Sequence, residues 1–222
     1  SGGAVRKAAL EVKQQIIDHA ALMLGVLKTD GFKLENRQVI APDGRTVSLQ
    51  DVALSSLHQL DQHQIMATAS NISPVSPPPT AAQFAEITVN TKTGKINVDR
   101  LLMVVDCGRV INPITAAGQV EGGMSQAMGF ALTEEMLFDQ DGQPLNPDLI
   151  KYHIPRAMEM PATDVIFVQT SEPTGPFGAK SVSEIAIDGV APAIASAIHD
   201  ATGVWMRTLP YTPERVMQAL QK

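Results

Sequence analysis

The chain has 222 residues, 44% of them apolar, and carries 17 Lys and Arg against 23 Asp and Glu, a formal net charge of −6. This acidic balance disfavours nucleic acid and anionic membranes as partners, and no segment approaches the roughly 20 uninterrupted apolar residues of a membrane-spanning helix. Cys107 is the only cysteine, which excludes an intrachain disulfide and a cysteine-based metal site and fits a reducing, cytoplasmic compartment.

The first part of the chain, residues 1–60, predicts a small helix–strand–helix subdomain. Apolar residues recur at steps of three and four over 4–25, which predicts an amphipathic helix that ends at the glycine. Residues 32–41 alternate roughly as in a strand. Ser48 can then cap a short helix over 49–57.

A proline-rich linker is predicted over 61–83. It contains Ser76-Pro77-Pro78-Pro79, whose fixed φ angles and missing N–H groups oppose both helices and strand ladders. The remainder, 84–222, mixes strands and helices without a repeated strand–helix–strand order. We therefore predict an α+β fold class, with mixed sheets and packed helices.

The larger part of the chain begins with a predicted hairpin. Strands over 84–89 and 96–105 are joined by a turn at 91–94, and the second strand is apolar on both faces, which indicates a central position in the sheet. The remaining predicted elements are a helix over 114–132, a strand over 164–169, a glycine-rich loop over 173–180, a helical turn capped by Ser183, a helix ended by Gly203, and a last helix over 213–220 capped by Thr212.

One face of the predicted helix over 114–132 carries Gln119, Gly122, Gln126 and Gly129. Glycine in a helix costs roughly 1 kcal/mol relative to alanine, so the pair Gly122-Gly123 indicates that something approaches the backbone closely. Carboxamides beside such a gap can bind the edge of a heterocycle. The alternative is close packing of a neighbouring element over the glycines, with the glutamines bonded to backbone.

The segment 175–184 forms a second candidate site, a loop that leads into a helical turn. Backbone N–H groups in such a loop suit anionic oxygen atoms, and Glu184 can act as a general base if a transferable proton lies within hydrogen-bond reach. An acidic residue there can also simply complement the helix dipole. Lys180 can pair with a cofactor phosphate or be a solvated surface lysine. These alternatives stay open on residue pattern alone.

Other chemistry has weaker support in the sequence. The five histidines show no metal-ligand spacing such as His-x-x-x-His, so a zinc or iron site made of protein side chains is not predicted. A hydrolase that uses Glu184 with His153 or His199 lacks a nucleophile motif. Cys107 is interpreted as a buried or turn cysteine at a strand end rather than as a nucleophile.

Four segments occur together in one order: AAQFAEI at 81–87, VVDCGRVINP at 104–113, GQVEGG at 118–123 and GPFGAKSVSE at 175–184. Together they resemble the C-terminal part of the molybdenum-binding subunit of the xanthine dehydrogenase and aldehyde oxidase family. The resemblance implies that 84–222 is a cofactor-binding subdomain and that a pterin dithiolene holds the molybdenum. It also implies residue roles, namely Glu184 as the catalytic base beside the metal, and Gln119, Lys180, Ser181, Val182 and Ser183 as cofactor-binding residues.

The resemblance further implies a molybdenum hydroxylase that oxidises an N-heteroaromatic compound, such as a purine, or an aldehyde with oxygen derived from water. Its cofactor is expected to be molybdopterin, either alone or as the cytosine dinucleotide, with an iron–sulfur cluster and FAD on partner chains or domains. The family's upstream cofactor loops have no counterpart in these residues, so the remaining part of the molybdenum-binding subunit is an expected partner. The alternative is a noncatalytic scaffold or partner-binding domain that keeps the fold without cofactor.

The segment 181–185 departs from the family's pattern. Ser181 and Ser183 stand where the family usually has small glycines, and Ile185 follows Glu184 where proline is common. The serine hydroxyls add hydrogen-bonding groups but narrow the pocket. The substrate of any one relative is therefore not carried over to this chain.

Overall fold

The computed structural model describes residues 1–58 and 62–221 and divides the chain into two compact units, Ser1–Pro74 and Val75–Lys222. This division falls within the linker predicted over 61–83, whose first boundary, between residues 60 and 61, lies outside the described residues. The predicted end of the linker is wrong, because a strand already begins at Thr80. The first residues of that strand are small or polar, so its alternating pattern is weak in the sequence.

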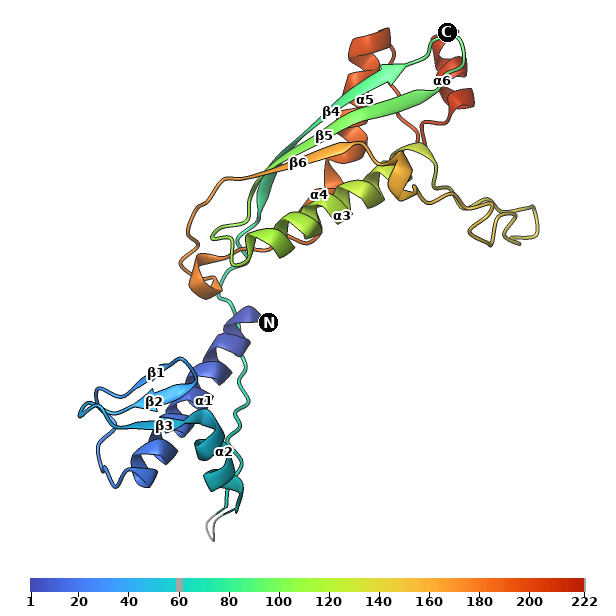
Figure 1. Ribbon diagram of the computed structural model, residues 1–222. Coiled ribbons are helices and arrows are strands. Elements are labelled where there is room, and N and C mark those ends of the chain that lie inside the picture. Colours follow the sequence, from blue (N-terminus) through green and yellow to red (C-terminus); the bar gives the residue numbers. More distant parts are fainter. Residues whose placement is uncertain (59–61, 222) are drawn as a thin grey trace. The chain divides into compact units, whose positions relative to one another are not determined.

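Unit 1 contains two helices and a three-stranded antiparallel sheet of order β1-β2-β3 (Figure 1). Its elements are α1 (Gly2–Met23), β1 (Lys33–Glu35), β2 (Gln38–Ile40), β3 (Thr46–Ser48) and α2 (Leu49–His58). The helix predicted over 4–25 ends two residues earlier, at Met23. Gly25 follows its end with a φ of +67°, and the Gly25 N–H donates to the Leu22 carbonyl at 3.1 Å.

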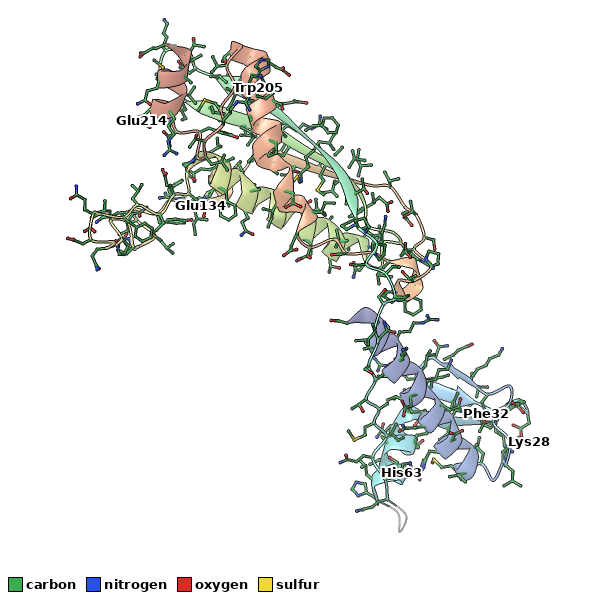
Figure 2. The ribbon with its side chains drawn as sticks, turned by 180° about the vertical axis from the view of Figure 1, so that it is seen from behind. Lys28, Phe32, His63, Glu134, Trp205 and Glu214 are labelled. Carbon is green, nitrogen blue, oxygen red and sulfur yellow. The ribbon has the colours of Figure 1, made fainter. Side chains whose placement is uncertain are left out.

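The single strand predicted over 32–41 is wrong, since the segment forms two strands and a third strand follows. Asn36 and Arg37 make the intervening turn with φ angles of 49° and 61°. Without a glycine at this turn, and with strands of three residues each, the period-2 pattern is too short to reveal the break. Buried side chains of α1 pack on this sheet together with Phe32 (Figure 2).

Unit 2 is built on a second three-stranded sheet, of order β4-β5-β6. Its strands are β4 (Thr80–Val89), β5 (Ile96–Asp106) and β6 (Ala162–Phe167), its α-helices are α3 (Pro113–Leu132), α4 (Ile185–Asp188), α5 (Val190–Thr202) and α6 (Pro213–Leu220), and its short 3-10 helices are η1 (Ala157–Glu159) and η2 (Pro176–Gly178). Strand β5 pairs antiparallel with β4 and parallel with β6. The predicted central position of β5 is therefore confirmed.

The core of unit 2 lies between the sheet and the helices α3 and α5 (Figure 1). Leu101, Met103 and Val105 alternate along β5 and are at most 1% exposed. Val120 of α3 and Ile194 of α5 are equally buried and join the same cluster. The predicted α+β class, with mixed strand directions and packed helices, is confirmed in this unit.

The helices α3 and α6 of unit 2 begin with the caps that the sequence predicts, whereas α4 does not. Asn112 Oδ1 accepts hydrogen bonds from the N–H groups of Ile114 and Thr115 at the start of α3, and Thr212 accepts one at the start of α6. The predicted cap at Ser183 is wrong. The residue that precedes α4 is Glu184, whose own helical backbone angles leave no side-chain cap.

Residues 133–161, between α3 and β6, form an arm that extends away from the sheet and returns to it at η1 (Figure 1). It exposes large apolar side chains, among them Phe138 at 60%, Ile150 at 93% and Met158 at 95%. Within the part of the chain that is described, no helix is both long and apolar enough to cross a membrane.

Candidate functional site

The glycine-rich loop of unit 2 is fastened to the end of β5 by the Asp106 carboxylate. This carboxylate accepts hydrogen bonds from the Lys180 ammonium at 2.9 Å, the Thr170 hydroxyl at 2.7 Å and the Gly108 N–H at 2.8 Å. These bonds, that of Lys180 first, lower the pKa of Asp106 to about 2. The Asp106 carboxyl is therefore ionised at neutral pH, and the side chains of Lys180 and Asp106 are only 11% and 21% exposed.

Backbone hydrogen bonds hold the same loop in register with the residues after β5. The Lys180 N–H donates to the Cys107 carbonyl at 2.7 Å, and the Arg109 N–H donates to the Gly178 carbonyl at 2.8 Å. Gly108 lies between these bonds with a φ of +70°, and a Cβ there would clash with the Gly178 oxygen. The close contact of strand end and loop thus requires glycine at position 108.

A hollow of about 290 Å³ opens between this loop and the start of α3. Three of the predicted cofactor-binding residues, Gln119, Lys180 and Val182, lie on its wall together with Arg109 and Asn112. The structure therefore brings together α3 and the loop, which are some 60 residues apart along the chain. Ser181, Ser183 and Glu184 are exposed but do not line this hollow.

The glycines of α3 divide between two environments. Nothing lies within 4 Å of the position of a Cβ at Gly122, whereas a Cβ at Gly123 would lie 2.5 Å from the Ala186 Cβ of α4. Gly129, expected on the open face, is buried, because the chain after α3 turns back and places the Glu134 carboxylate against it. Close packing is therefore found at Gly123, and the space beside Gly122 is open.

Lys180 is neither a solvated surface lysine nor a lysine with an unused charge. Its ammonium is committed to Asp106, 74 residues earlier in the chain, so any contact with a cofactor phosphate would have to share or break that ion pair. Glu184 lies one residue before α4, and its carbonyl accepts a hydrogen bond from the Ile187 N–H at 2.9 Å.

Sequence reasoning missed three residues that shape the site. Asp106 holds the loop, Arg109 lies on the wall of the hollow, and Gln83 of β4 donates to the Ala186 carbonyl of α4 at 2.8 Å. All three lie in segments that carry the family resemblance, and that resemblance was the signal that could have identified them. Their partners lie far away along the chain, so the residue patterns alone gave no indication of these contacts.

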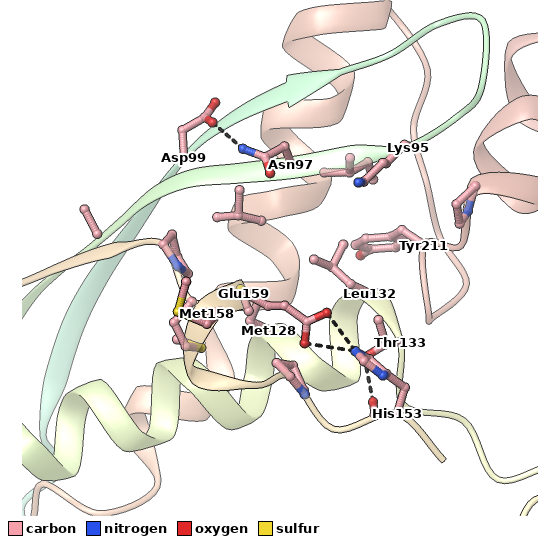
Figure 3. Close-up of a pocket in the computed structure, with 17 residues that line it drawn as sticks. Lys95, Asn97, Asp99, Met128, Leu132, Thr133, His153, Met158, Glu159 and Tyr211 are labelled. Carbon is pink, nitrogen blue, oxygen red and sulfur yellow. Dashed lines mark hydrogen bonds and ion pairs between the residues drawn. The ribbon is translucent and has the colours of Figure 1, made fainter. Parts of the chain in front are cut away.

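A larger hollow of about 630 Å³ lies by the C-terminal end of α3, where His153 Nε2 is 3.1 Å from Glu159 Oε2 (Figure 3). The six predicted site residues, all of them described, are not on its wall. The other candidate histidine, His199, stacks on Trp205 with ring centroids 4.2 Å apart. Both imidazoles have partners other than Glu184, so the hydrolase alternative gains no support.

Cys107 is buried beneath the loop. Burial raises the pKa of its thiol, which keeps it protonated at neutral pH and agrees with the predicted buried cysteine. Over the described ranges 1–58 and 62–221, no three His, Cys, Asp or Glu side chains are grouped to hold a metal ion.

A family model described as a molybdopterin cofactor-binding domain matches residues 1–161. The chain belongs to this family. The probable hypoxanthine oxidase XdhD of Escherichia coli (strain K12) is 40% identical over 223 residues, covering 100% of this chain and 23% of that protein. The putative xanthine dehydrogenase molybdenum-binding subunit XdhA of the same organism is 36% identical over 219 residues, covering 97% of this chain and 29% of that protein.

Solved structures agree with this molybdopterin-binding family. The reconstituted CO dehydrogenase from Oligotropha carboxidovorans matches with a TM-score of 0.73 and 25% identity over 96% of this chain and 28% of that chain. Quinoline 2-oxidoreductase from Pseudomonas putida 86 matches with a TM-score of 0.74 and 23% identity over 95% and 28% of the two chains, a likeness of fold alone. The predicted resemblance is confirmed, and this chain spans less than a third of each relative.

Proposed function

We propose that this molybdopterin-binding domain is part of a molybdenum hydroxylase that oxidises an N-heteroaromatic or aldehyde substrate with oxygen derived from water. The observation that carries the proposal is the meeting of Gln119 with the loop at 179–182 around one hollow, in a chain whose family binds molybdopterin. The printed names of the two Escherichia coli relatives, a hypoxanthine oxidase and a xanthine dehydrogenase subunit, favour a purine or a related heterocycle.

The residues around the hollow fit a pterin cofactor by their chemistry. The exposed Gln119 carboxamide offers both donors and acceptors to the edge of a heterocycle, and the Arg109 guanidinium suits phosphate oxygens. The open space beside Gly122 lets a planar group approach the helix backbone. We assign cofactor contacts to Gln119 and to the loop residues Ser181, Val182 and Ser183, with Lys180 contributing through its hold on the loop.

Glu184 is assigned as the general base. When bound, the molybdenum cofactor supplies the redox chemistry and takes the electrons from the substrate. The protein must orient the reacting groups and accept a proton. Glu184 is exposed, and its side chain does not cap α4, so its carboxylate oxygens are not committed to holding the helix.

The remaining part of the molybdenum-binding subunit is the proposed first partner. The chain spans 23% and 29% of its two Escherichia coli relatives, and the arm over 133–161 exposes Phe138, Ile150 and Met158. Apolar side chains gathered on a surface commonly mark a protein contact. Iron–sulfur and flavin chains or domains are the proposed electron acceptors, the cytoplasm is the proposed location, and the cytosine dinucleotide is one proposed form of the cofactor.

The replacement Glu184→Gln in the assembled enzyme tests the proposal. Glutamine keeps the size of the side chain but cannot accept the proton, so reduction of the enzyme by substrate should slow at least about 10²-fold. Molybdenum content and melting temperature should stay close to those of the parent enzyme. Asp188→Asn, which removes one exposed negative charge from the same short helix, is the control and should keep the original rate.

Stopped-flow reduction, metal analysis and thermal melting on the same preparations provide the readout. A fully metallated Glu184→Gln enzyme that is reduced at the original rate would refute the assignment. The noncatalytic alternative instead predicts that the purified native assembly contains no molybdenum.

A further inference from the structure

Gln83 of β4 connects the sheet to the short helix that follows Glu184. Its Nε2 donates to the Ala186 carbonyl at 2.8 Å and lies 3.5 Å from the Ile185 carbonyl and 3.3 Å from Met103 Sδ. Its Oε1 is buried and has no hydrogen-bond partner within the described chain. A buried amide oxygen without a hydrogen-bond partner lowers the stability of the fold. Gln83 carries this cost while its nitrogen bonds to α4.

Helix α4 cannot hold its own position. It has four residues, far fewer than an isolated helix needs for stability, and the last carbonyl groups of a helix have no partner within that helix. Gln83 supplies a donor to them from the sheet side. Gly189, at the break, leaves room for this, because a Cβ at that position would clash with Gln83 Oε1.

The opposite side of α4 rests on α3. A Cβ at Gly123 would lie 2.5 Å from the Ala186 Cβ, so Ala186 is held between α3 and the Gln83 amide. Ala186 is two residues after Glu184, and the Ile187 N–H bonds to the Glu184 carbonyl. The backbone position of Glu184 therefore depends on this clamp.

We propose that Gln83 is a positioning residue that sets the place of Glu184 through the backbone of α4. This inference rests on the proposed role of Glu184 as the base. Gln83 does not touch the reacting groups, and its amide acts on the two residues that directly follow Glu184 in the chain. A base displaced by even about 1 Å loses much of its effect.

The experiment uses Gln83→Met in the assembled molybdenum enzyme, because methionine keeps the length of the side chain but cannot donate to the Ala186 carbonyl. We expect reduction by substrate to slow about tenfold or more at unchanged molybdenum content, with little change in KM. Gln218→Met on α6, a matched change at an exposed glutamine of the same unit, should keep the parent rate.

A double-mutant cycle separates positioning from a general structural role. If Gln83 acts through Glu184, then Gln83→Met added to Glu184→Gln should slow the enzyme by no more than about twofold further, since residues that act as one unit are not additive. A full tenfold further loss in that background overturns the inference. So does a lower melting temperature with the parent rate retained.

Failure of this inference differs from failure of the proposed function. A parent-like rate for Glu184→Gln refutes the function itself, whereas slow Glu184→Gln with parent-like Gln83→Met refutes only the positioning role. If Gln83→Met does not assemble, Gly189→Ala replaces it, because the added methyl displaces the Gln83 amide. A parent-like rate for metallated Gly189→Ala would likewise overturn the inference.

Discussion

The two sides of α3 have opposite environments although they carry adjacent glycines. The side with Gly123 is closed against α4, while the side with Gly122 and Gln119 is open. A glycine pair in a helix can therefore serve packing and ligand access at once. The packed side of α3 holds Ala186 of α4, and the open side carries Gln119, the proposed cofactor contact.

The largest effect in this comparison is expected for Gly123→Ala. The new methyl would lie 2.5 Å from the Ala186 Cβ, and overpacking of this kind typically costs about 1–3 kcal/mol of unfolding free energy. Urea unfolding of the chain would measure the loss. An unchanged urea midpoint would show that α4 can shift at no cost in stability. Gly123 would then not be required for close packing.

On the open side, Gln119→Ala should act on the cofactor rather than on the fold. The side chain is exposed, so the unfolding free energy should change by no more than about 0.5 kcal/mol, while molybdenum content of the assembled enzyme falls by about threefold to tenfold. Metal analysis and thermal melting of the same preparation distinguish an effect on the cofactor from an effect on the fold. Full molybdenum content with a melting temperature several degrees lower would favour a packing role instead.

Asp106→Asn should lower the free energy of unfolding by an amount that depends on pH, because it weakens the hydrogen bonds that hold the loop. The folded-state pKa of Asp106 is about 2, below its ordinary value of 3.8, so the stabilisation is complete above about pH 4 and disappears as pH falls towards 2. At pH 7 we expect a loss on the order of 1 kcal/mol, the scale of a partly exposed ion pair with charged hydrogen bonds.

Unfolding of the parent and Asp106→Asn chains at several pH values would check this. The difference between them should shrink below pH 4, and a constant difference down to pH 2 would exclude the charge of Asp106 as its source. Lys180→Met should show a loss of similar size at pH 7, since it removes the main partner of the same carboxylate.

The smallest effect, and the opposite sign, is expected for Gly122→Ala. Nothing lies within 4 Å of the new Cβ, and alanine is favoured over glycine in a helix by roughly 0.5–1 kcal/mol. The free chain should therefore become more stable. If the open side receives the cofactor, the same change should lower molybdenum content in the assembled enzyme, a pair of outcomes that simple packing does not predict.

Local signals in the sequence were sufficient for much of the fold. Asn112 and Pro113 mark the start of α3 because the cap and the first turn involve neighbouring residues. The apolar run 101–105 identifies β5, which lies between β4 and β6, although only the face with Leu101, Met103 and Val105 is fully buried. The turn at Asn36 and Arg37 could not be foreseen in the same way, since neither residue requires a positive φ.

The candidate site was predictable only as separate pieces. Gln119 and the segment 175–184 stand out by composition and by family resemblance, and the structure brings part of that segment beside Gln119. The links between the pieces join residues distant in sequence, such as Lys180 with Asp106 and Gln83 with Ala186. No periodicity or spacing encodes such pairs, because they arise only when the sheet has formed.

The carboxylate of Asp106 has a consequence for the order in which this unit folds during synthesis. It joins the end of β5 to residues that follow β6, and these two strands pair across about 60 residues of chain. Such distant contacts form late in folding. The wall of the hollow therefore forms only after synthesis has passed Lys180, because Asp106 has neither Thr170 nor Lys180 as a partner before then.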